Sequence, residues 1–320
     1  CEYAVMEVSS QGIKMHRTDG LYFNYAIFTN ISPDHIGPGE HADFEEYLYY
    51  KTRLLNMCGI GLVNKDDEHA PQIIKAANCE LYTYSEESKE ADFVASDIRY
   101  VSQPDFVGTE FHISGKYDME VRLGIPGLFN VVNALAAVSV CSFLGLDQAR
   151  ISHALENIRV NGRMEIVYTS ERCTVLVDYA HNAVSMESLL STLRDYKPKR
   201  LVCVFGCGGN RSKDRRYSMG EIGGKMADLS IITADNSRYE KVEDIIADIR
   251  GSIEKTGGKF IEIPDRREAI RYSILHAQPG DMVAVIGKGH EDYQEINGVR
   301  HHFLDREVIE ETVKELGEKA

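Results

Sequence analysis

The chain lacks long apolar runs and paired cysteines, and both absences narrow its class. No run of 18 or more apolar residues occurs among its 320 residues, and the amino terminus lacks the basic and then apolar pattern of a signal peptide. We therefore expect a protein that is neither exported nor membrane-spanning. The seven cysteines are odd in number and include no Cys-x-x-Cys pair, which argues against a disulfide framework and a zinc ribbon. This pattern fits the reducing cytoplasm.

The chain also lacks an extended basic patch. Its formal net charge is -14, so long-range repulsion disfavours nucleic acid and anionic membranes as partners. The densest basic run, residues 211–216, is short and follows glycines. It predicts a small-anion site, although a solvated loop is the plainer interpretation. We expect no nucleic acid and no membrane among the partners.

Length and pattern predict two α/β domains, at residues 1–163 and 164–320. Domains usually contain about 100 to 200 residues, so 320 residues allow two with ample cores. The first domain alternates strands with helices, which predicts a doubly wound, mainly parallel sheet, and two-residue alternation between about 96 and 123 adds a small antiparallel sheet. Its expected strands are 3–8, 25–30 and 59–64, and its expected helices are 44–56, 130–144 and 147–158.

The second domain is expected to be a separate, open, Rossmann-like sheet. Strands and helices alternate without interruption after Gly162-Arg163-Met164-Glu165. Asn297-Gly298 between two alternating stretches predicts a two-residue hairpin. The expected strands are 174–179, 201–205, 229–233, 259–263 and 282–286, and the amphipathic helices are 184–196, 242–253, 266–276 and 306–316.

Three polar residues of the first domain are candidates for chemistry. Glu7 lies at the end of the first predicted strand and His35 follows the second, and a carboxylate and an imidazole at one sheet edge suit a divalent cation bound to a nucleotide. Ordinary loop residues are the alternative. Lys51 lies in the apolar part of a helix, where an ammonium is costly unless it is paired or chemically changed. The alternative is a lysine whose stem reaches back to water.

These features occur within a series of motifs that resembles the Mur ligases, and most closely those that add the third residue to the peptidoglycan precursor. The resemblance covers nearly the whole chain. The motifs, in order, are Met6-Glu7-Val8-Ser9-Ser10, Thr29-Asn30-Ile31-Ser32-Pro33-Asp34-His35, the Lys51 helix, Phe129-Asn130-Val131-Val132-Asn133-Ala134-Leu135-Ala136-Ala137, Gly162-Arg163-Met164-Glu165, Asp178-Tyr179-Ala180-His181 and Gly287-Lys288-Gly289-His290-Glu291. It implies a central ATP-binding domain and a C-terminal, Rossmann-like, amino-acid-binding domain.

The resemblance also implies roles for individual residues. Lys51 matches a carbamylated lysine, whose carbamate binds magnesium together with Glu7 and His35. Asn133, Arg163, Asp178 and His181 match residues that hold ATP. Ser9 and Arg17 match contacts to UDP-N-acetylmuramoyl-dipeptide, whereas Gln11 and Met15 depart from the usual His and Gln nearby.

The implied reaction is the ATP-dependent addition of a diamino acid to UDP-N-acetylmuramoyl-L-Ala-D-Glu by a cytoplasmic, monomeric ligase. ATP phosphorylates the terminal carboxylate of the dipeptide, and an amine then displaces phosphate from the acyl phosphate. Charge neutralisation and positioning, which magnesium and lysine supply, provide most of the help that this reaction needs.

The four residues Asp235-Asn236-Ser237-Arg238 bear on which amino acid is added. They resemble an Asp-Asn-Pro-Arg signature of ligases that add meso-diaminopimelate, where the arginine binds the distal carboxylate that lysine lacks. Ser237 departs from the proline. A lysine-adding ligase therefore stays open, and without its neighbours Arg238 would be a surface ion pair with Glu240 or Asp235. Arg216, Gly287 and Glu291 match the remaining contacts to the amino acid.

A phosphate-binding loop is absent from the sequence. No Gly-x-x-Gly-Lys-Thr/Ser occurs, although backbone amides and a lysine must neutralise the triphosphate. In the family this loop precedes the strand expected at 3–8. We therefore expect a fragment, inactive by itself, of a longer ligase. Other Mur-like ligases, which add glutamate to folates or build cyanophycin, and a non-catalytic binding module of the same fold are the alternatives.

Overall fold

The computed structural model describes residues 1–33 and 36–317 of the chain. Its residues group into two compact units. The first contains residues 1–98, 110–121 and 129–155, and the second contains residues 99–109, 122–128 and 156–320. The predicted boundary at residue 163 stays a prediction, and each unit is described by itself below.

A six-stranded sheet with the order β1-β2-β3-β4-β5-β6 forms most of the first unit, although the parts of β4 to β6 within residues 99–109 and 122–123 group with the second unit. Strands β1 to β4 pair in parallel, and a two-residue turn at Pro104-Asp105 reverses the chain between β4 and β5. The strands are β1 (Phe23–Phe28), β2 (Cys58–Asn64), β3 (Glu80–Ser85), β4 (Phe93–Gln103), β5 (Phe106–Gly115) and β6 (Met119–Leu123). The helices are α1 (Ser10–Lys14), α2 (Phe44–Thr52), the 3-10 helix η1 (Arg53–Asn56), α3 (Ala70–Ala76), α4 (Leu128–Phe143) and α5 (Gln148–Glu156).

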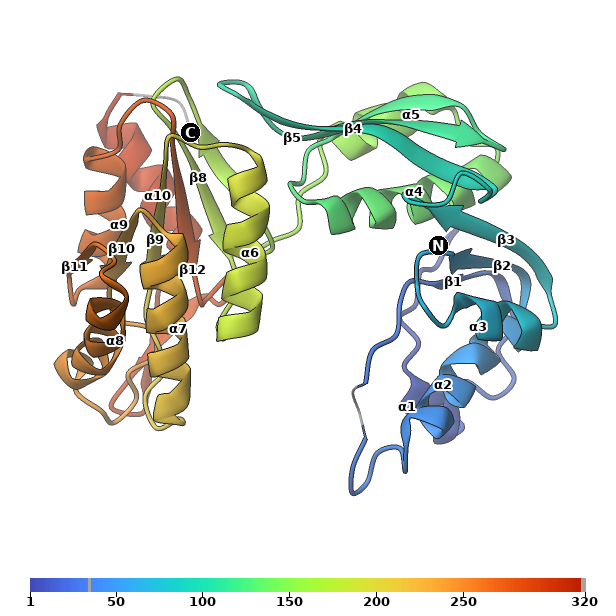
Figure 1. Cartoon of the computed structure of the whole chain (residues 1–320), viewed down its shortest axis with the longest axis horizontal. Coiled ribbons are helices and arrows are strands. Elements are labelled where there is room, and N and C mark those ends of the chain that lie inside the picture. Colours follow the sequence, from blue (N-terminus) through green and yellow to red (C-terminus); the bar gives the residue numbers. More distant parts are fainter. Residues whose placement is uncertain (34–35, 318–320) are drawn as a thin grey trace. The chain divides into compact units, whose positions relative to one another are not determined.

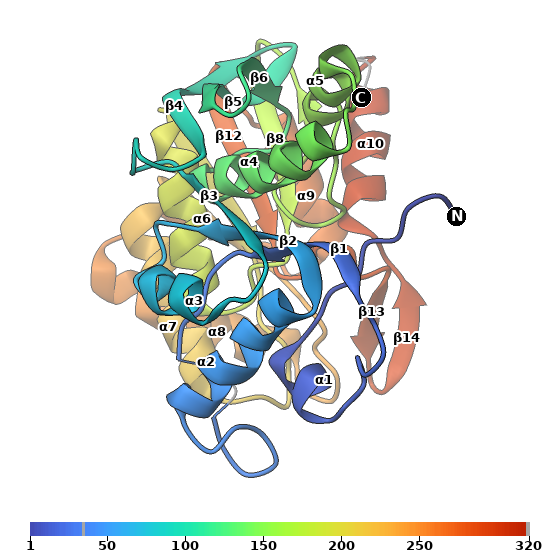
Figure 2. The same ribbon diagram turned by 90° about the vertical axis from the view of Figure 1, so that its right-hand side faces the viewer.

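Helices cover both faces of the parallel strands in the first unit. Apolar residues of α2, η1 and α3, such as Leu48, Leu55 and Ile73, pack on one face with Phe28 and Val63. Helix α4 lies on the opposite face, where the Phe143 ring contacts the rings of Tyr25, Tyr82 and Phe93 (Figures 1 and 2). This two-sided burial is the reason that β2 reads as a continuous apolar run.

One predicted strand of the first unit is wrong. Residues 3–8 form no strand, and residues 1–7 are exposed and pair with no described strand. The chain instead enters α1 at Ser10, where the Ser9 hydroxyl accepts a hydrogen bond from the Gly12 amide at 3.0 Å and caps the helix. A strand needs a neighbour for its backbone groups, and the described residues supply none here.

The second unit is an open α/β sheet with the order β11-β10-β9-β12-β8-β7. All neighbours pair in parallel except β7, which is antiparallel to β8. The strands are β7 (Glu165–Thr169), β8 (Cys173–Asp178), β9 (Arg200–Phe205), β10 (Leu229–Ile232), β11 (Phe260–Glu262) and β12 (Asp281–Ile286). The helices are α6 (Ala183–Asp195), α7 (Lys213–Met226), α8 (Val242–Thr256), α9 (Arg266–Leu275) and α10 (Asp305–Glu315).

Three layers form around this second sheet. Helices α6, α7 and α8 pack on one face with Leu201, Cys203 and Phe205 of β9, and α9 and α10 pack on the other with Val202 and Val204 (Figure 1). The predicted hairpin is confirmed as β13 (Tyr293–Ile296) and β14 (Val299–His302), with Asn297 and Gly298 at positive φ. The expected fold class, two α/β units with parallel-dominant sheets, is confirmed. Among the described residues, no helix is long and apolar enough to span a bilayer.

Candidate functional site

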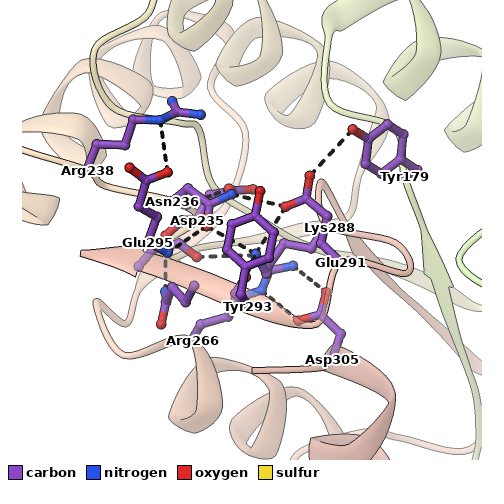
Figure 3. A network of polar contacts seen from close by, with 12 residues as sticks. Tyr179, Asp235, Asn236, Arg238, Arg266, Lys288, Glu291, Tyr293, Glu295 and Asp305 are labelled. Atoms are coloured by element: carbon purple, nitrogen blue, oxygen red, sulfur yellow. Dashed lines mark hydrogen bonds and ion pairs between the residues drawn. The ribbon is translucent and has the colours of Figure 1, made fainter. Parts of the chain in front are cut away.

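The carboxyl edge of the second sheet gathers most of the predicted amino-acid contacts. Strand β9 ends before Gly206, β10 ends two residues before Ala234-Asp235, and β12 ends before Gly287. Because these strands are parallel neighbours, their following loops leave the same edge of the sheet, where open α/β folds bind ligands. Polar residues that follow β10 and β12 form most of the network drawn in Figure 3.

Arg238 is held on this edge by backbone and side-chain contacts. Its φ of 51° lies in the left-handed region, and the turn is fixed because its amide donates to the Glu295 carbonyl at 3.0 Å. The guanidinium Nη1 donates to the Gly209 carbonyl at 2.7 Å, and Nε lies 3.5 Å from the Glu295 carboxylate (Figure 3). The side chain remains 24% exposed, so the guanidinium is positioned and can still reach a ligand.

Gly209 allows this arrangement because it lies directly against the Arg238 loop. A Cβ at Gly209 would lie 1.9 Å from the Ser237 carbonyl oxygen, which no side-chain adjustment could relieve. The Gly209 amide donates to the Asn236 carbonyl at 2.8 Å. The glycines after β9 are therefore needed for loop packing, in addition to any contact with a ligand.

Asn236 and Glu291 lie side by side next to Arg238. The Asn236 amide nitrogen donates to Glu291 Oε2 at 3.1 Å, and its Oδ1 accepts from the Glu295 amide at 2.9 Å. The Tyr179 hydroxyl donates to Glu291 Oε1 at 3.5 Å (Figure 3). Burial, followed by the Glu291 charge, raises the pKa of Tyr179, so its hydroxyl stays a donor. A carboxylate and a guanidinium are thus presented together at the sheet edge.

Asp235 and Gly287 are in close contact, and this contact joins the loops that follow β10 and β12. A Cβ at Gly287 would lie 2.8 Å from Asp235 Oδ2, and Gly287 has a φ of 111°, which favours glycine. The Asp235 side chain is buried, and its Oδ1 accepts a hydrogen bond from the backbone N–H of Asn236 at 2.5 Å. These two predicted contacts are therefore adjacent in the structure.

The guanidinium of Arg216 is used inside the protein. It is 1% exposed, and it donates to both oxygens of Glu240 at 2.8 Å and to Asp248 at 2.9 Å. The hydrogen bond from Arg216 lowers the pKa of Glu240, whose carboxylate also accepts from the Asn210 amide. Direct contact between Arg216 and an amino acid stays a prediction, and the observed contacts favour positioning of the loop after β9. Arg211 on that loop is exposed and makes no ion pair within the described part of the chain.

Three of the residues predicted to hold ATP lie near the end of β8: Asp178 is its last residue, His181 follows it, and Arg163 precedes β7. Asp178 accepts from the Met164 amide at 2.8 Å and the Ala180 amide at 2.7 Å, and burial raises its pKa. The exposed Arg163 guanidinium lies 4.9 Å from the centre of the Tyr179 ring, and His181 Nδ1 lies 3.0 Å from the Tyr179 carbonyl oxygen. Asp178, Arg163 and His181 therefore gather around Tyr179.

The Lys51 ammonium in the first unit lies beside the end of β1. Its Nζ donates to the Asn30 carbonyl at 3.0 Å and lies 5.3 Å from the Tyr47 ring centre and 5.9 Å from that of Phe28. These contacts stabilise a cation. A carbamate on the same nitrogen would keep one N–H for Asn30 and add two oxygens, the ligand type that magnesium prefers, so the position fits the modification.

The other predicted metal ligands are not brought together in the described residues. Glu7 is exposed in the amino-terminal segment, which has no regular secondary structure, and His35 lies outside the described residues. Within residues 1–33 and 36–317, no three His, Cys, Asp or Glu side chains gather in a way that could hold a metal ion. The set of Glu7, His35 and Lys51 stays a prediction.

The remaining predicted contacts lie on helices or their caps in the first unit. Ser9 caps α1, and Arg17 is exposed, with its guanidinium donating to the Met15 sulfur at 3.5 Å. Asn133 is exposed on α4. Ser9 and Arg17 thus flank one short helix, and Asn133 is accessible to a ligand.

Two features of the site are not predicted from the sequence. Lys288 is fully buried beside Asn236 and Glu291. The sequence pattern that could have indicated this residue is a lysine between two glycines after an apolar strand. Arg266 and Asp305 form a fully buried ion pair under the loops (Figure 3). They lie 39 residues apart, and no local pattern links them.

Sequence comparison relates the chain to ligases of cell-wall synthesis. Residues 1–141 match the model of the Mur ligase middle domain, and residues 162–289 match that of the Mur ligase, glutamate ligase domain. A UDP-N-acetylmuramoyl-L-alanyl-D-glutamate--2,6-diaminopimelate ligase of Caldanaerobacter subterraneus is 38% identical over 98% of this chain and 64% of its own length. A second such ligase, from Clostridium acetobutylicum, is 40% identical over 96% of this chain and 63% of its own length. The chain thus spans a little under two thirds of these relatives.

Structural comparison agrees with this relationship. A solved UDP-N-acetylmuramoyl-L-alanyl-D-glutamate--2,6-diaminopimelate ligase superposes with a TM-score of 0.77 at 34% identity, over 98% of this chain and 64% of that one. A UDP-N-acetylmuramate-alanine ligase from Thermotoga maritima shares the fold at 19% identity, with a TM-score of 0.62, over 92% of this chain and 60% of that one. The chain therefore belongs to the Mur ligase family and carries its middle domain and its glutamate ligase domain.

Proposed function

We propose that the chain acts within an ATP-dependent ligase that adds meso-diaminopimelate to UDP-N-acetylmuramoyl-L-alanyl-D-glutamate in peptidoglycan synthesis. The observation that carries the proposal is the pair of opposite charges at the sheet edge. The Arg238 guanidinium and the Glu291 carboxylate are presented by loops that Asn236 joins. An amino acid with two carboxylates and two amino groups is complementary to such a pair, and the relatives at 38% and 40% identity are named as diaminopimelate ligases.

Arg238 supplies the expected selectivity against lysine. Its planar guanidinium can bind a distal carboxylate through two hydrogen bonds, and lysine has no carboxylate at that end. Glu291 is proposed to accept a hydrogen bond from an ammonium group of the amino acid, and Asp235, Asn236 and Gly287 to line the same subsite. A lysine-adding ligase is the second candidate, since Ser237 stands where the signature has proline.

The remaining residues are proposed to hold the other two substrates. Arg163, Asp178 and His181, around Tyr179, and Asn133 on α4 would hold ATP, and a guanidinium as exposed as that of Arg163 suits a phosphate. Ser9 and Arg17 would contact the muramoyl-dipeptide. With ATP and a nucleotide-linked precursor as substrates, we place the ligase in the cytoplasm. A monomeric state is proposed from the family resemblance alone.

Magnesium is proposed to lie near Lys51. When bound there, held by a Lys51 carbamate with Glu7 and His35, it would neutralise negative charge on the phosphate groups. The Lys51 nitrogen remains oriented by the Asn30 carbonyl at 3.0 Å. A mass increase of about 44 Da on the peptide that contains Lys51 would support the modification.

Calorimetry with the 320-residue chain tests the choice of amino acid. We expect meso-diaminopimelate to bind at least tenfold more tightly than lysine, and Arg238→Ala to remove this preference because the distal carboxylate loses its partner. Arg200→Gln is the matched control, because Arg200 pairs with Asp281 at the opposite edge of the same sheet. Equal binding of lysine and diaminopimelate, unaffected by Arg238→Ala, would show that the assignment is wrong.

A further inference from the structure

Lys288 is the charged side chain at the candidate amino-acid site that has no assigned role. It follows β12 between Gly287 and Gly289 and is 0% exposed. A buried ammonium is costly unless its donors are satisfied. The fold retains this cation at the edge of the sheet, so its contacts indicate what it does there.

The Lys288 ammonium joins three segments of the chain. Its Nζ lies 3.3 Å from Asn236 Oδ1, in the loop after β10, and 3.4 Å from Glu291 Oε2, in its own turn. It also donates to the Tyr293 carbonyl at the start of β13 and lies 5.3 Å from the centre of the Tyr293 ring (Figure 3). One side chain therefore links both ligand-facing loops to the hairpin.

The first consequence concerns the orientation of Asn236. Its Oδ1 faces two donors, Lys288 Nζ and the Glu295 amide, so its amide nitrogen must face Glu291 Oε2 at 3.1 Å. The opposite orientation would place an NH2 group against an ammonium and an N–H. Lys288 thereby determines which atoms of Asn236 and Glu291 remain for a ligand.

The second consequence concerns Arg238. The Tyr293 carbonyl is held by Lys288, and Glu295 lies two residues further along β13. Glu295 accepts from the Arg238 amide through its carbonyl and lies 3.5 Å from Arg238 Nε through its carboxylate. A displacement of β13 would therefore move the guanidinium that is proposed to bind the distal carboxylate.

We propose that Lys288 is a positioning residue of the amino-acid subsite. Its ammonium aligns Glu291 and Asn236 directly and Arg238 through β13, without contacting the amino acid itself. This inference rests on the proposed function, because it takes the diamino acid as the ligand of the subsite. Gly287 and Gly289, with φ of 111° and 52°, allow the tight turn that directs Lys288 inward.

Lys288→Met in the 320-residue chain tests the inference, because methionine keeps most of the volume and removes every donor. We expect the calorimetric affinity of the variant for meso-diaminopimelate to fall tenfold or more. The ratio of its affinities for meso-diaminopimelate and lysine should also decrease. Amide hydrogen exchange of Glu295 should accelerate at least tenfold, because its acceptor on Asn236 loses its anchor. Arg200→Gln, at the opposite sheet edge, should change neither quantity at temperatures where it is folded.

The outcomes separate the inference from the proposed function. If Lys288→Met is folded and binds diaminopimelate within twofold of the unmodified chain, the inference is overturned. If the unmodified chain binds neither amino acid, the proposed function fails. The amide hydrogen exchange of Glu295 then tests the role of Lys288 by itself, and an unchanged exchange rate in Lys288→Met overturns that role. Should the methionine variant not fold, Lys288→Gln replaces it. A neutral amide can donate to the Tyr293 carbonyl but cannot also hold Asn236 and Glu291 as the ammonium does, so an affinity within twofold of the unmodified chain still overturns the inference.

Discussion

The buried ion pair of Arg266 and Asp305 lies next to the strand ends that carry the loops of the candidate site. Both side chains are 0% exposed, and Nε and Nη2 of Arg266 each donate to one Asp305 oxygen at 2.7 Å. The same guanidinium donates to the Ala234 carbonyl at 3.2 Å and the Ile286 carbonyl at 3.0 Å. These carbonyls directly precede Asp235 and Gly287. Arg266 therefore ties together the two strand ends from which the amino-acid loops begin.

Asp305→Asn is predicted to destabilise the second unit strongly. The amide keeps the size of the carboxylate but leaves a fully buried guanidinium without the carboxylate that pairs with it directly. Breaking one side of a buried ion pair costs about 3–5 kcal/mol. In a unit of this size, 1 kcal/mol shifts the unfolding midpoint by about 2–4 °C, so we expect a fall of about 6–20 °C.

Far-UV circular dichroism is a suitable assay, since the chain contains no tryptophan: heating gives the midpoint and urea gives the free energy of unfolding. Hydrogen exchange followed by mass spectrometry assigns the loss to the second unit. Glu221→Gln is the matched control, because it makes the same change in an exposed i, i+4 pair with Lys225, which contributes only about 0.3–0.5 kcal/mol. If Asp305→Asn costs less than about 1 kcal/mol, or no more than Glu221→Gln, the reasoning about burial is refuted.

Two further predictions concern a titrating carboxyl group and a glycine. Burial and the nearby Asp66 raise the pKa of Glu86 to about 6, so its carboxyl destabilises the first unit above that pH and not below 4.5. Glu86→Gln should therefore stabilise the chain by up to about 1 kcal/mol at pH 7.5, after allowance for solvent exposure, and by about nothing at pH 3.5, below both pKa values. Equal gains in thermal unfolding at both pH values would contradict this sign. Gly209→Ala should cost about 1–3 kcal/mol and weaken binding of diaminopimelate, because its Cβ would lie 1.9 Å from the Ser237 carbonyl oxygen. Gly251→Ala, with no atom within 4 Å of its Cβ, is the control and should be neutral or stabilising, and equal losses in the two variants would refute the steric argument.

Local patterns were sufficient to predict much of the second unit. Apolar runs such as Val202 to Phe205 predict buried parallel strands, and Asn297-Gly298 predicts the hairpin, because both depend on neighbours in the sequence. Helix α7 was missed, since its three glycines weaken the apolar periodicity. The strand expected at 3–8 failed because a strand also needs a partner, which no local pattern supplies.

The sequence by itself determined the family, the two α/β units and the motifs that carry the candidate site. Only the tertiary structure decided how the charged residues of those motifs are used. Arg216 lies in a basic run that could face a ligand, but folding brings Glu240 and Asp248 to its guanidinium. Lys288 is a lysine between two glycines in the sequence, but it becomes a buried link among three segments. The physical reason is that a cation binds the carboxylates and carbonyls that the fold places within about 3 Å. The partners Glu240 and Asp248 of Arg216 lie 24 and 32 residues away along the chain, and Asn236 lies 52 residues from Lys288.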